Sequence, residues 1–174
     1  MERRISFDTT NHGERAEFLN DATILRRSSS FNGGAAWCPQ PLTPRIVNLQ
    51  GRDTTAIGFS VVVREVDDSL VGSLKVGLTT EAVTANLAEV QLFALPYTKW
   101  FNILELARRN LEVKEIVGIY IVSAPDTTVL VTLNDTIVSS TLWPQGRERP
   151  APSQAYALVE VYGQAVSVEL LQPF

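Results

Sequence analysis

Residues 69–80 read Ser69-Leu70-Val71-Gly72-Ser73-Leu74-Lys75-Val76-Gly77-Leu78-Thr79-Thr80, and the expected sheet is built around them. Leu74, Val76 and Leu78 alternate with polar or small residues, a period of two that is typical of a strand with one buried face. Gly72 and Gly77 stand where a Cβ would obstruct a bend or a neighbouring backbone. Because apolar runs lie on both sides along the chain, the stretch predicts a central strand of an antiparallel sheet.

Further strands are predicted along most of the chain. Ile57 to Val63 alternates, 116–122 is apolar on both faces, and Asn134-Asp135 is a two-residue hairpin signal between 129–133 and 137–138. Residues 156–161 and 166–170 flank a turn at Gly163, and 22–27 is expected to pair with 31–37. Many short strands with frequent turn signals predict an all-β fold, an antiparallel β-sandwich that forms a single domain over residues 1–174.

One segment has the spacing of a helix. Trp100, Ile103, Leu104 and Ala107 fall at i, i+3, i+4 and i+7, with Thr98 as the expected N-cap and the end of the helix near residues 108–110. Residues 38–45 and 145–152 are expected to be proline-bearing loops, and 81–99 an irregular connection. The sandwich is therefore expected to carry one short helix.

Composition restricts the classes of function. The chain has 174 residues, a hydrophobic content of 45% and a net charge of −4, which describes a soluble globular protein and argues against nucleic acid as a partner. No apolar run reaches the roughly 20 residues of a membrane span. Because the start lacks the apolar stretch of a secretory signal, and the one cysteine allows no internal disulfide, the expected location is cytoplasmic.

Groups suited to catalysis are few. The chain has one histidine, His12, and one cysteine, Cys38, with no clustered metal ligands and no phosphate-binding glycine loop or nucleophile elbow. The pair Asp67-Asp68 is typical of a solvated turn. The sequence therefore predicts neither an enzyme nor a bound metal or cofactor.

Surface candidates are arginines and tryptophans. Arginine pairs occur at Arg26-Arg27 and Arg108-Arg109, and such pairs are either solvated charges or forks for acidic groups. Trp37 and Trp143 stand beside loop prolines, where an aromatic residue is either a binding anchor or part of the core. Trp100, on the apolar face of the expected helix, is assigned to the core.

A family resemblance covers nearly the whole chain. Its residues, in order, are Phe7, His12-Gly13, Ala22, Arg26-Arg27, Ser30 to Gly33, Pro41-Leu42, Gly72 to Thr79, Trp100, Tyr156 to Gly163, and Val168 to Leu170. This order resembles a Neuralized homology repeat, a β-sandwich module similar to SPRY domains. The chain differs at Leu70, where the family usually has Trp, at Trp37-Cys38 in place of Phe-Ser, and at Glu160 in place of Asp.

The resemblance implies a protein-interaction module that recognises a partner protein or a short peptide motif. Many family members are ubiquitin ligases and some are scaffolds, so the chain is expected to be the partner-binding part of such a protein. Loops at 26–34, 36–45, 95–100 and 143–150 are the expected site, with Arg26, Arg27, Ser30, Trp37, Tyr97, Trp143 and Arg147 as partner-binding residues. The alternatives are a glycan-binding sandwich and binding to anionic lipid.

Overall fold

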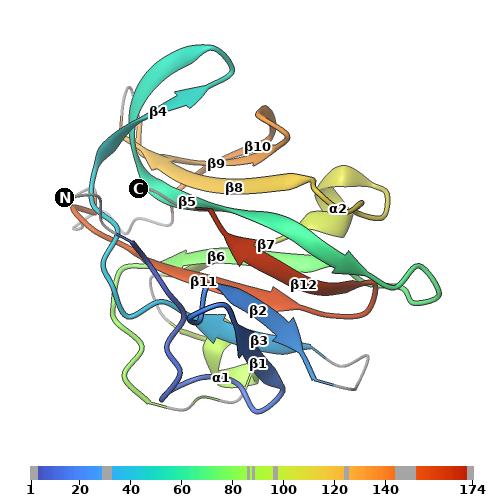
Figure 1. Cartoon of the computed structure of the whole chain (residues 1–174). Coiled ribbons are helices and arrows are strands. Elements are labelled where there is room, and N and C mark those ends of the chain that lie inside the picture. The colour runs from blue at the N-terminus through green and yellow to red at the C-terminus, as the bar shows by residue number, and fades with distance from the viewer. Residues whose placement is uncertain are drawn as a thin grey trace.

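Two antiparallel sheets packed face to face make up the structure, a computed structural model (Figure 1). It describes residues 4–28, 33–85, 87, 89–95, 98–123, 126–143 and 152–171. These residues form twelve strands and two short helices. The fold is therefore the all-β antiparallel sandwich that the strand pattern predicts.

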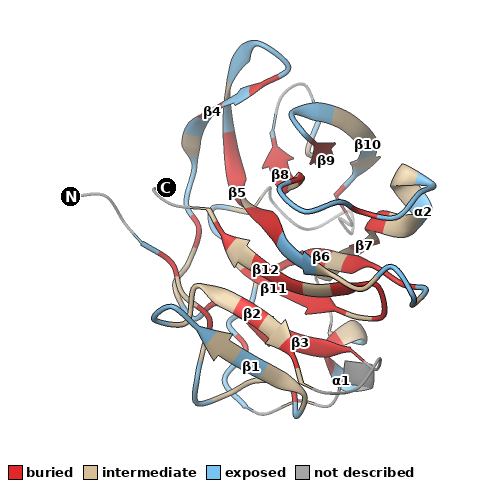
Figure 2. Ribbon diagram, turned by 45° about the vertical axis from the view of Figure 1, so that its right-hand side comes forward, coloured by how far each residue is buried: buried red, intermediate tan, exposed pale blue. Residues whose placement is uncertain are grey.

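The larger sheet has eight strands. Along its main path the order is β1 (Ala16–Leu19), β2 (Ile24–Arg27), β12 (Ala165–Leu170), β5 (Arg52–Val66), β8 (Ile116–Val122), β9 (Thr128–Leu133) and β10 (Thr136–Leu142). The eighth strand, β4 (Arg45–Leu49), pairs with the first residues of β5 and forms a hairpin with it. This hairpin extends beyond the rest of the sandwich, beside β9 and β10 (Figure 1), and its tip is largely exposed (Figure 2).

The smaller sheet has the order β3 (Gly34–Trp37), β11 (Tyr156–Val161), β6 (Leu74–Thr79) and β7 (Thr98–Asn102). The prediction of a central strand in residues 69–80 is confirmed, because β6 pairs with β11 on one side and β7 on the other. Its alternating residues Leu74, Val76 and Leu78 are fully buried. A Cβ on Gly77 would lie 2.9 Å from the carbonyl oxygen of Lys99, so this glycine permits the close approach of β7.

The main core lies between the two sheets. It combines the inward residues of both, such as Leu25, Phe59 and Val76, and burial is concentrated there (Figure 2). A second cluster, here the outer cluster, lies on the other face of the smaller sheet and consists of Ala35, Trp37, Val83, Leu92 and Leu158. The segment between β6 and β7, which includes helix α1 (Glu89–Phe93), covers it. This connection is thus a packed part of the fold.

The predicted helix is wrong in its first half. Thr98 to Asn102 forms β7, and helix α2 occupies only Ile103–Ala107. Asn102, rather than Thr98, is the N-cap, since its side-chain oxygen accepts a hydrogen bond from the Leu104 amide. Pairing with β6 places Phe101 in the main core, and this tertiary contact outweighs the helical spacing. The prediction of one helix is also incomplete, because α1 is a second.

The predicted pairing of residues 22–27 with 31–37 is wrong as well. β2 and β3 lie in different sheets, where β2 pairs with β1 and β12, and β3 pairs with β11. The turn at Gly163 is confirmed, with a φ of 55°, yet it joins β11 and β12 across the two sheets. The hairpin at Asn134-Asp135 is confirmed, and both residues have positive φ as this turn requires.

Candidate functional site

The predicted partner-binding arginines are held by strand β2. Arg26 lies on the outer face of the larger sheet, where its guanidinium is 3.0 Å from a Glu65 carboxylate oxygen and 3.6 Å from one of Glu17. Arg27, on the opposite face of the strand, is only 8% exposed. Arg26 is thus part of a surface ion-pair ladder, and Arg27 is part of the interior.

The predicted tryptophans are both buried. Trp37 is completely inaccessible and lies in the outer cluster, while Trp143 is 6% exposed and belongs to the main core. Trp100, assigned to the core as a helical residue, is a half-buried strand residue that packs against the outer cluster and edge-on against Phe93. In this structure neither Trp37 nor Trp143 presents a ring to a partner.

Ser30, Tyr97 and Arg147 lie outside the described residues and stay predictions. The register separates the four predicted loops into two groups, because 26–34 precedes β3 at the Val161 end of β11, whereas 36–45 follows β3 at the Tyr156 end. Residues 98–100 are the first residues of β7, which begins at that second end, as β11 does. The described strand ends that border the predicted loops therefore lie at two ends of the sandwich, and the site itself stays a prediction.

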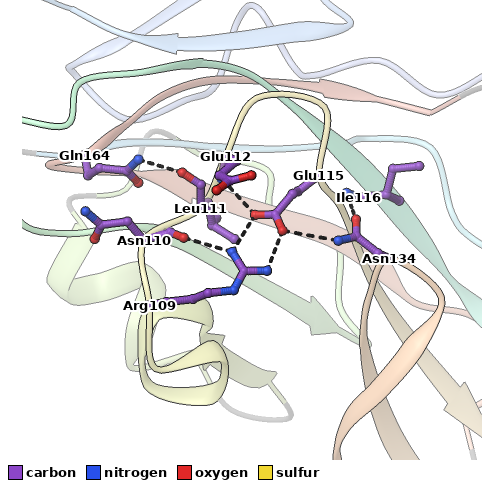
Figure 3. Close-up of polar contacts among 8 residues, drawn as sticks. All are labelled: Arg109, Asn110, Leu111, Glu112, Glu115, Ile116, Asn134 and Gln164. Atoms are coloured by element: carbon purple, nitrogen blue, oxygen red, sulfur yellow. Dashed lines mark hydrogen bonds and ion pairs between the residues drawn. The ribbon is translucent and has the colours of Figure 1, made fainter.

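A polar network joins the loops at the Val161 end (Figure 3). Arg109 donates two hydrogen bonds to the Glu115 carboxylate, which also accepts from the Glu112 amide and from Asn134 Nδ2. Gln164, fully buried, donates from Nε2 to the Leu111 carbonyl oxygen at 2.7 Å. Because every Glu115 oxygen is engaged, the arrangement is a structural link between loops.

The contribution of Glu115 to the free energy of unfolding is expected to depend on pH. Hydrogen bonding from Arg109 is the main cause that holds the pKa of Glu115 below its usual value. A lowered pKa in the folded state adds stability above the unfolded value of about 4.3, and this contribution is lost as the pH falls through the folded-state pKa. We expect Glu115→Gln to cost about 2 kcal/mol at neutral pH, and clearly less near about pH 3. Urea unfolding of both proteins at the two pH values measures this, and an equal cost at both would contradict it.

Away from the predicted site residues, the surface of the larger sheet is hollowed beside the β4–β5 hairpin. A groove of about 540 Å³ opens between the β4–β5 hairpin and the outer face of β8, β9 and β10. Its described lining residues are Leu49, Gln50, Arg52, Thr54, Val122, Leu130 and Ile137. We call it the hairpin groove. Its volume lies within the range of pockets that hold small ligands or a few side chains.

The alternation of the hairpin strands determines the composition of the groove. In the β4–β5 ladder Leu49 pairs with Arg52 and Val47 with Thr54, so these residues share one face. Val47 and Leu49 pack with Tyr120, Val122 and Leu130 in a third apolar cluster that holds the hairpin against the sheet. The aliphatic side chains on the floor of the groove are therefore held on paired strands, with Leu49 and Val122 buried and Leu130 and Ile137 half-buried, next to the polar Gln50, Arg52 and Thr54.

Electrostatically, the hairpin face is cationic. Arg45 lies near Tyr120, and burial lowers the pKa of this arginine while burial raises the pKa of the Tyr120 phenol. Arg52 lies at the exposed end of the face. The remaining residues on that face, Val47, Leu49, Thr54 and Ala56, are uncharged.

None of the four predicted site residues that the structure describes lines this groove. A signal for it exists in residues 45–56, where two alternating runs flank the turn at Gln50-Gly51, both with positive φ. That pattern predicts a hairpin with Val47, Leu49 and Ala56 on one face. It cannot show that the hairpin folds back over β8–β10, because the contact is a tertiary one.

The described residues offer neither a reactive cysteine nor a set of metal ligands. Cys38 is buried, and this burial raises the pKa of its thiol far above the usual range, which disfavours the reactive thiolate. Among the residues that the structure describes, no three His, Cys, Asp or Glu side chains form a group that could hold a metal ion. Within the same residues, no helix is long and apolar enough to cross a membrane.

Comparisons with solved structures agree with the fold. The crystal structure of the Drosophila melanogaster Neuralized NHR1 domain matches with a TM-score of 0.64 and 16% identity, over 98% of this chain and 99% of that one. A solution structure of the NHR domain of Drosophila melanogaster Neuralized gives 0.64 and 17%, over 98% and 92%. A human SPRY domain gives 0.54 and 19%, over 90% and 94%. These TM-scores and coverages show a shared fold at low sequence identity.

The sequence of the chain was also compared with curated proteins and with models of protein families. In the comparison with curated proteins, no sequence matches this chain. The Neuralized family model, in contrast, matches residues 7–172, which is nearly the whole chain. Together with the SPRY-like neighbours, this match supports a protein-interaction module. The chain belongs to the Neuralized family.

Proposed function

We propose that the chain is a protein-interaction module that binds a short segment of a partner protein in the hairpin groove. The observation that carries the proposal is the groove itself, with an aliphatic floor on paired strands and polar residues at its rim. Clustered aliphatic side chains supply affinity, and a few placed polar groups supply orientation. A groove of about 540 Å³ suits a few consecutive side chains rather than the surface of a folded domain.

In this proposal the chain, residues 1–174, acts as one repeat that recognises but does not modify its partner. Arg52 is the one ionisable side chain among the described residues that line the groove, and a guanidinium is a poor acid or base because it stays charged. As a member of the Neuralized family, the chain is proposed to act in the cytoplasm as the partner-binding part of a ubiquitin ligase or scaffold. The net charge of −4 disfavours nucleic acid as the partner.

Two neighbouring threonines offer a matched test. Thr54 lines the groove, whereas Thr55, the next residue of the same strand, is exposed on the opposite face of the hairpin. We expect Thr54→Trp to fill the groove and to weaken partner binding by about tenfold or more, while Thr55→Trp leaves it unchanged. Both variants should keep the melting temperature of the wild type within a few degrees.

The measurement is affinity capture from cell lysate with quantitative mass spectrometry, run in parallel on the wild type and both variants. Support requires a protein that the wild type and Thr55→Trp capture equally and that Thr54→Trp captures about tenfold less. If all three proteins capture the same set in the same amounts, the groove is not the binding site.

A further inference from the structure

We infer that the segment bound in the hairpin groove is an acidic peptide, in which an Asp or Glu stands close to an aliphatic residue. The inference rests on the proposed function and adds the chemistry of the partner. It is drawn from the charges that surround the groove, from the ionic partners of each arginine, and from the composition of the floor.

The first observation is that carboxylates are absent from both walls of the groove. Among the described residues that line the groove, Arg52 carries a charge and none is Asp or Glu. Arg45 lies further along the same hairpin face, and the carboxylate that acts on Tyr120, that of Asp135, belongs to the β9–β10 turn. Asp53 belongs to the other face of the hairpin, where Asn48 donates a hydrogen bond to it at 3.2 Å. The lining of the groove therefore carries one positive charge, at Arg52, in a chain whose net charge is −4.

The second observation concerns the partners of the arginines. Arg26, Arg64 and Arg109 each form an ion pair with a carboxylate of the chain. Arg52, within the described part of the chain, forms no such pair, although it is exposed at the rim of a groove. A guanidinium presents a planar fork that binds a carboxylate through two hydrogen bonds, so Arg52 is available for an acidic side chain of the partner.

The third observation is the floor. Leu130 and Ile137, both half-buried, contribute aliphatic surface to the groove that holds Arg52, whereas Leu49 and Val122 are already packed in the third apolar cluster. A ligand that satisfied the guanidinium alone would leave this surface in contact with water, which costs free energy. A peptide with an aliphatic side chain near an acidic one can bind the guanidinium of Arg52 and cover the aliphatic side chains of the groove at the same time. Because the rest of the protein is acidic, it repels such a segment elsewhere and favours the groove.

The test is a selection from a random peptide library displayed on phage, with the purified full chain as bait. Enriched peptides are synthesised, and their dissociation constants are measured by fluorescence polarisation against the wild type, Arg52→Gln, Arg108→Gln and Thr54→Trp. Arg108 is exposed beyond helix α2 and provides the same loss of charge away from the groove. We expect enrichment of Asp or Glu next to Leu, Ile or Val, and affinities that fall as salt is raised.

The variants then separate the outcomes. Arg52→Gln should weaken binding by about tenfold, the usual size of a lost hydrogen bond to a charged group, and Arg108→Gln should not. Neutral peptides that Thr54→Trp fails to bind would overturn the acidic inference while the proposed function stands. Peptides that bind Thr54→Trp as well as the wild type would overturn both. Anionic phosphatidylserine vesicles that bind the wild type and displace the peptides, with no binding to Thr54→Trp, would assign the groove to lipid and also overturn the inference.

Discussion

Replacement of Trp37 by alanine is expected to lower the free energy of unfolding by about 4 kcal/mol, the usual cost of removing a large aromatic side chain from a core. The ring is completely inaccessible and contacts the outer cluster, including Leu92 and Leu158. Its removal would leave a cavity between the smaller sheet and the segment that covers it. Chemical denaturation followed by circular dichroism measures the change.

Two further variants make the Trp37 result specific. The indole Nε1 has no hydrogen-bond partner among the described residues, so Trp37→Phe loses volume but no hydrogen bond and should cost less than half as much. Val71→Ala, at a side chain that is 86% exposed, should cost almost nothing. If Trp37→Ala left the unfolding free energy unchanged and instead abolished partner binding, Trp37 would be a binding anchor and the assignment to the core would be wrong.

Gly163→Ala is expected to be similarly destabilising, by about 3 kcal/mol or more. Gly163 has a φ of 55°, and a Cβ there would lie 2.0 Å from the carbonyl oxygen of Val71. The clash is with backbone, which cannot rotate away as a side chain can. The new methyl group would therefore separate the β11–β12 turn from the loop that precedes β6.

Gly51→Ala is the matched control for Gly163→Ala. Gly51 also has a positive φ, 79°, but a Cβ there would meet nothing within 4 Å. This variant isolates the conformational cost of a left-handed residue, about 1 kcal/mol. Equal effects of the two substitutions on the unfolding midpoint would show that the contact with Val71 contributes nothing.

Local patterns predicted much of the fold. The alternation of Leu74, Val76 and Leu78 predicted a central strand, and Gly72 and Gly77 predicted close approach of backbone. Asn134-Asp135 predicted its hairpin, because a two-residue turn of this type depends on residues that tolerate positive φ. Each of these features is decided within a few residues.

The errors arose where distant contacts decide the outcome. Residues 98–102 begin the segment in which Trp100, Ile103 and Ala107 have helical spacing. They nevertheless form an edge strand, because β6 pairs with them through hydrogen bonds and Phe101 packs in the main core. β2 follows the expected pattern but pairs with β12, which lies about 140 residues further along the chain. No periodicity within a short window carries this information.

The candidate site was the least predictable part. Trp37 and Trp143 stand beside prolines in the sequence, which suits an exposed anchor, but the structure covers both rings. The hairpin groove depends on how β4 and β5 fold over β8–β10, and its residues, such as Leu49 and Leu130, are unremarkable in the sequence. Family resemblance predicted the class of function without predicting the surface.

The central claim, that the hairpin groove is the binding surface, is tested most directly by hydrogen–deuterium exchange of the full chain with and without a saturating selected peptide. The account predicts slower exchange in residues 45–56 and 128–137, which form the hairpin and the strands opposite it. Slower exchange confined to the loops at 38–44, 67–73 or 108–115, with no change in the hairpin, would contradict it.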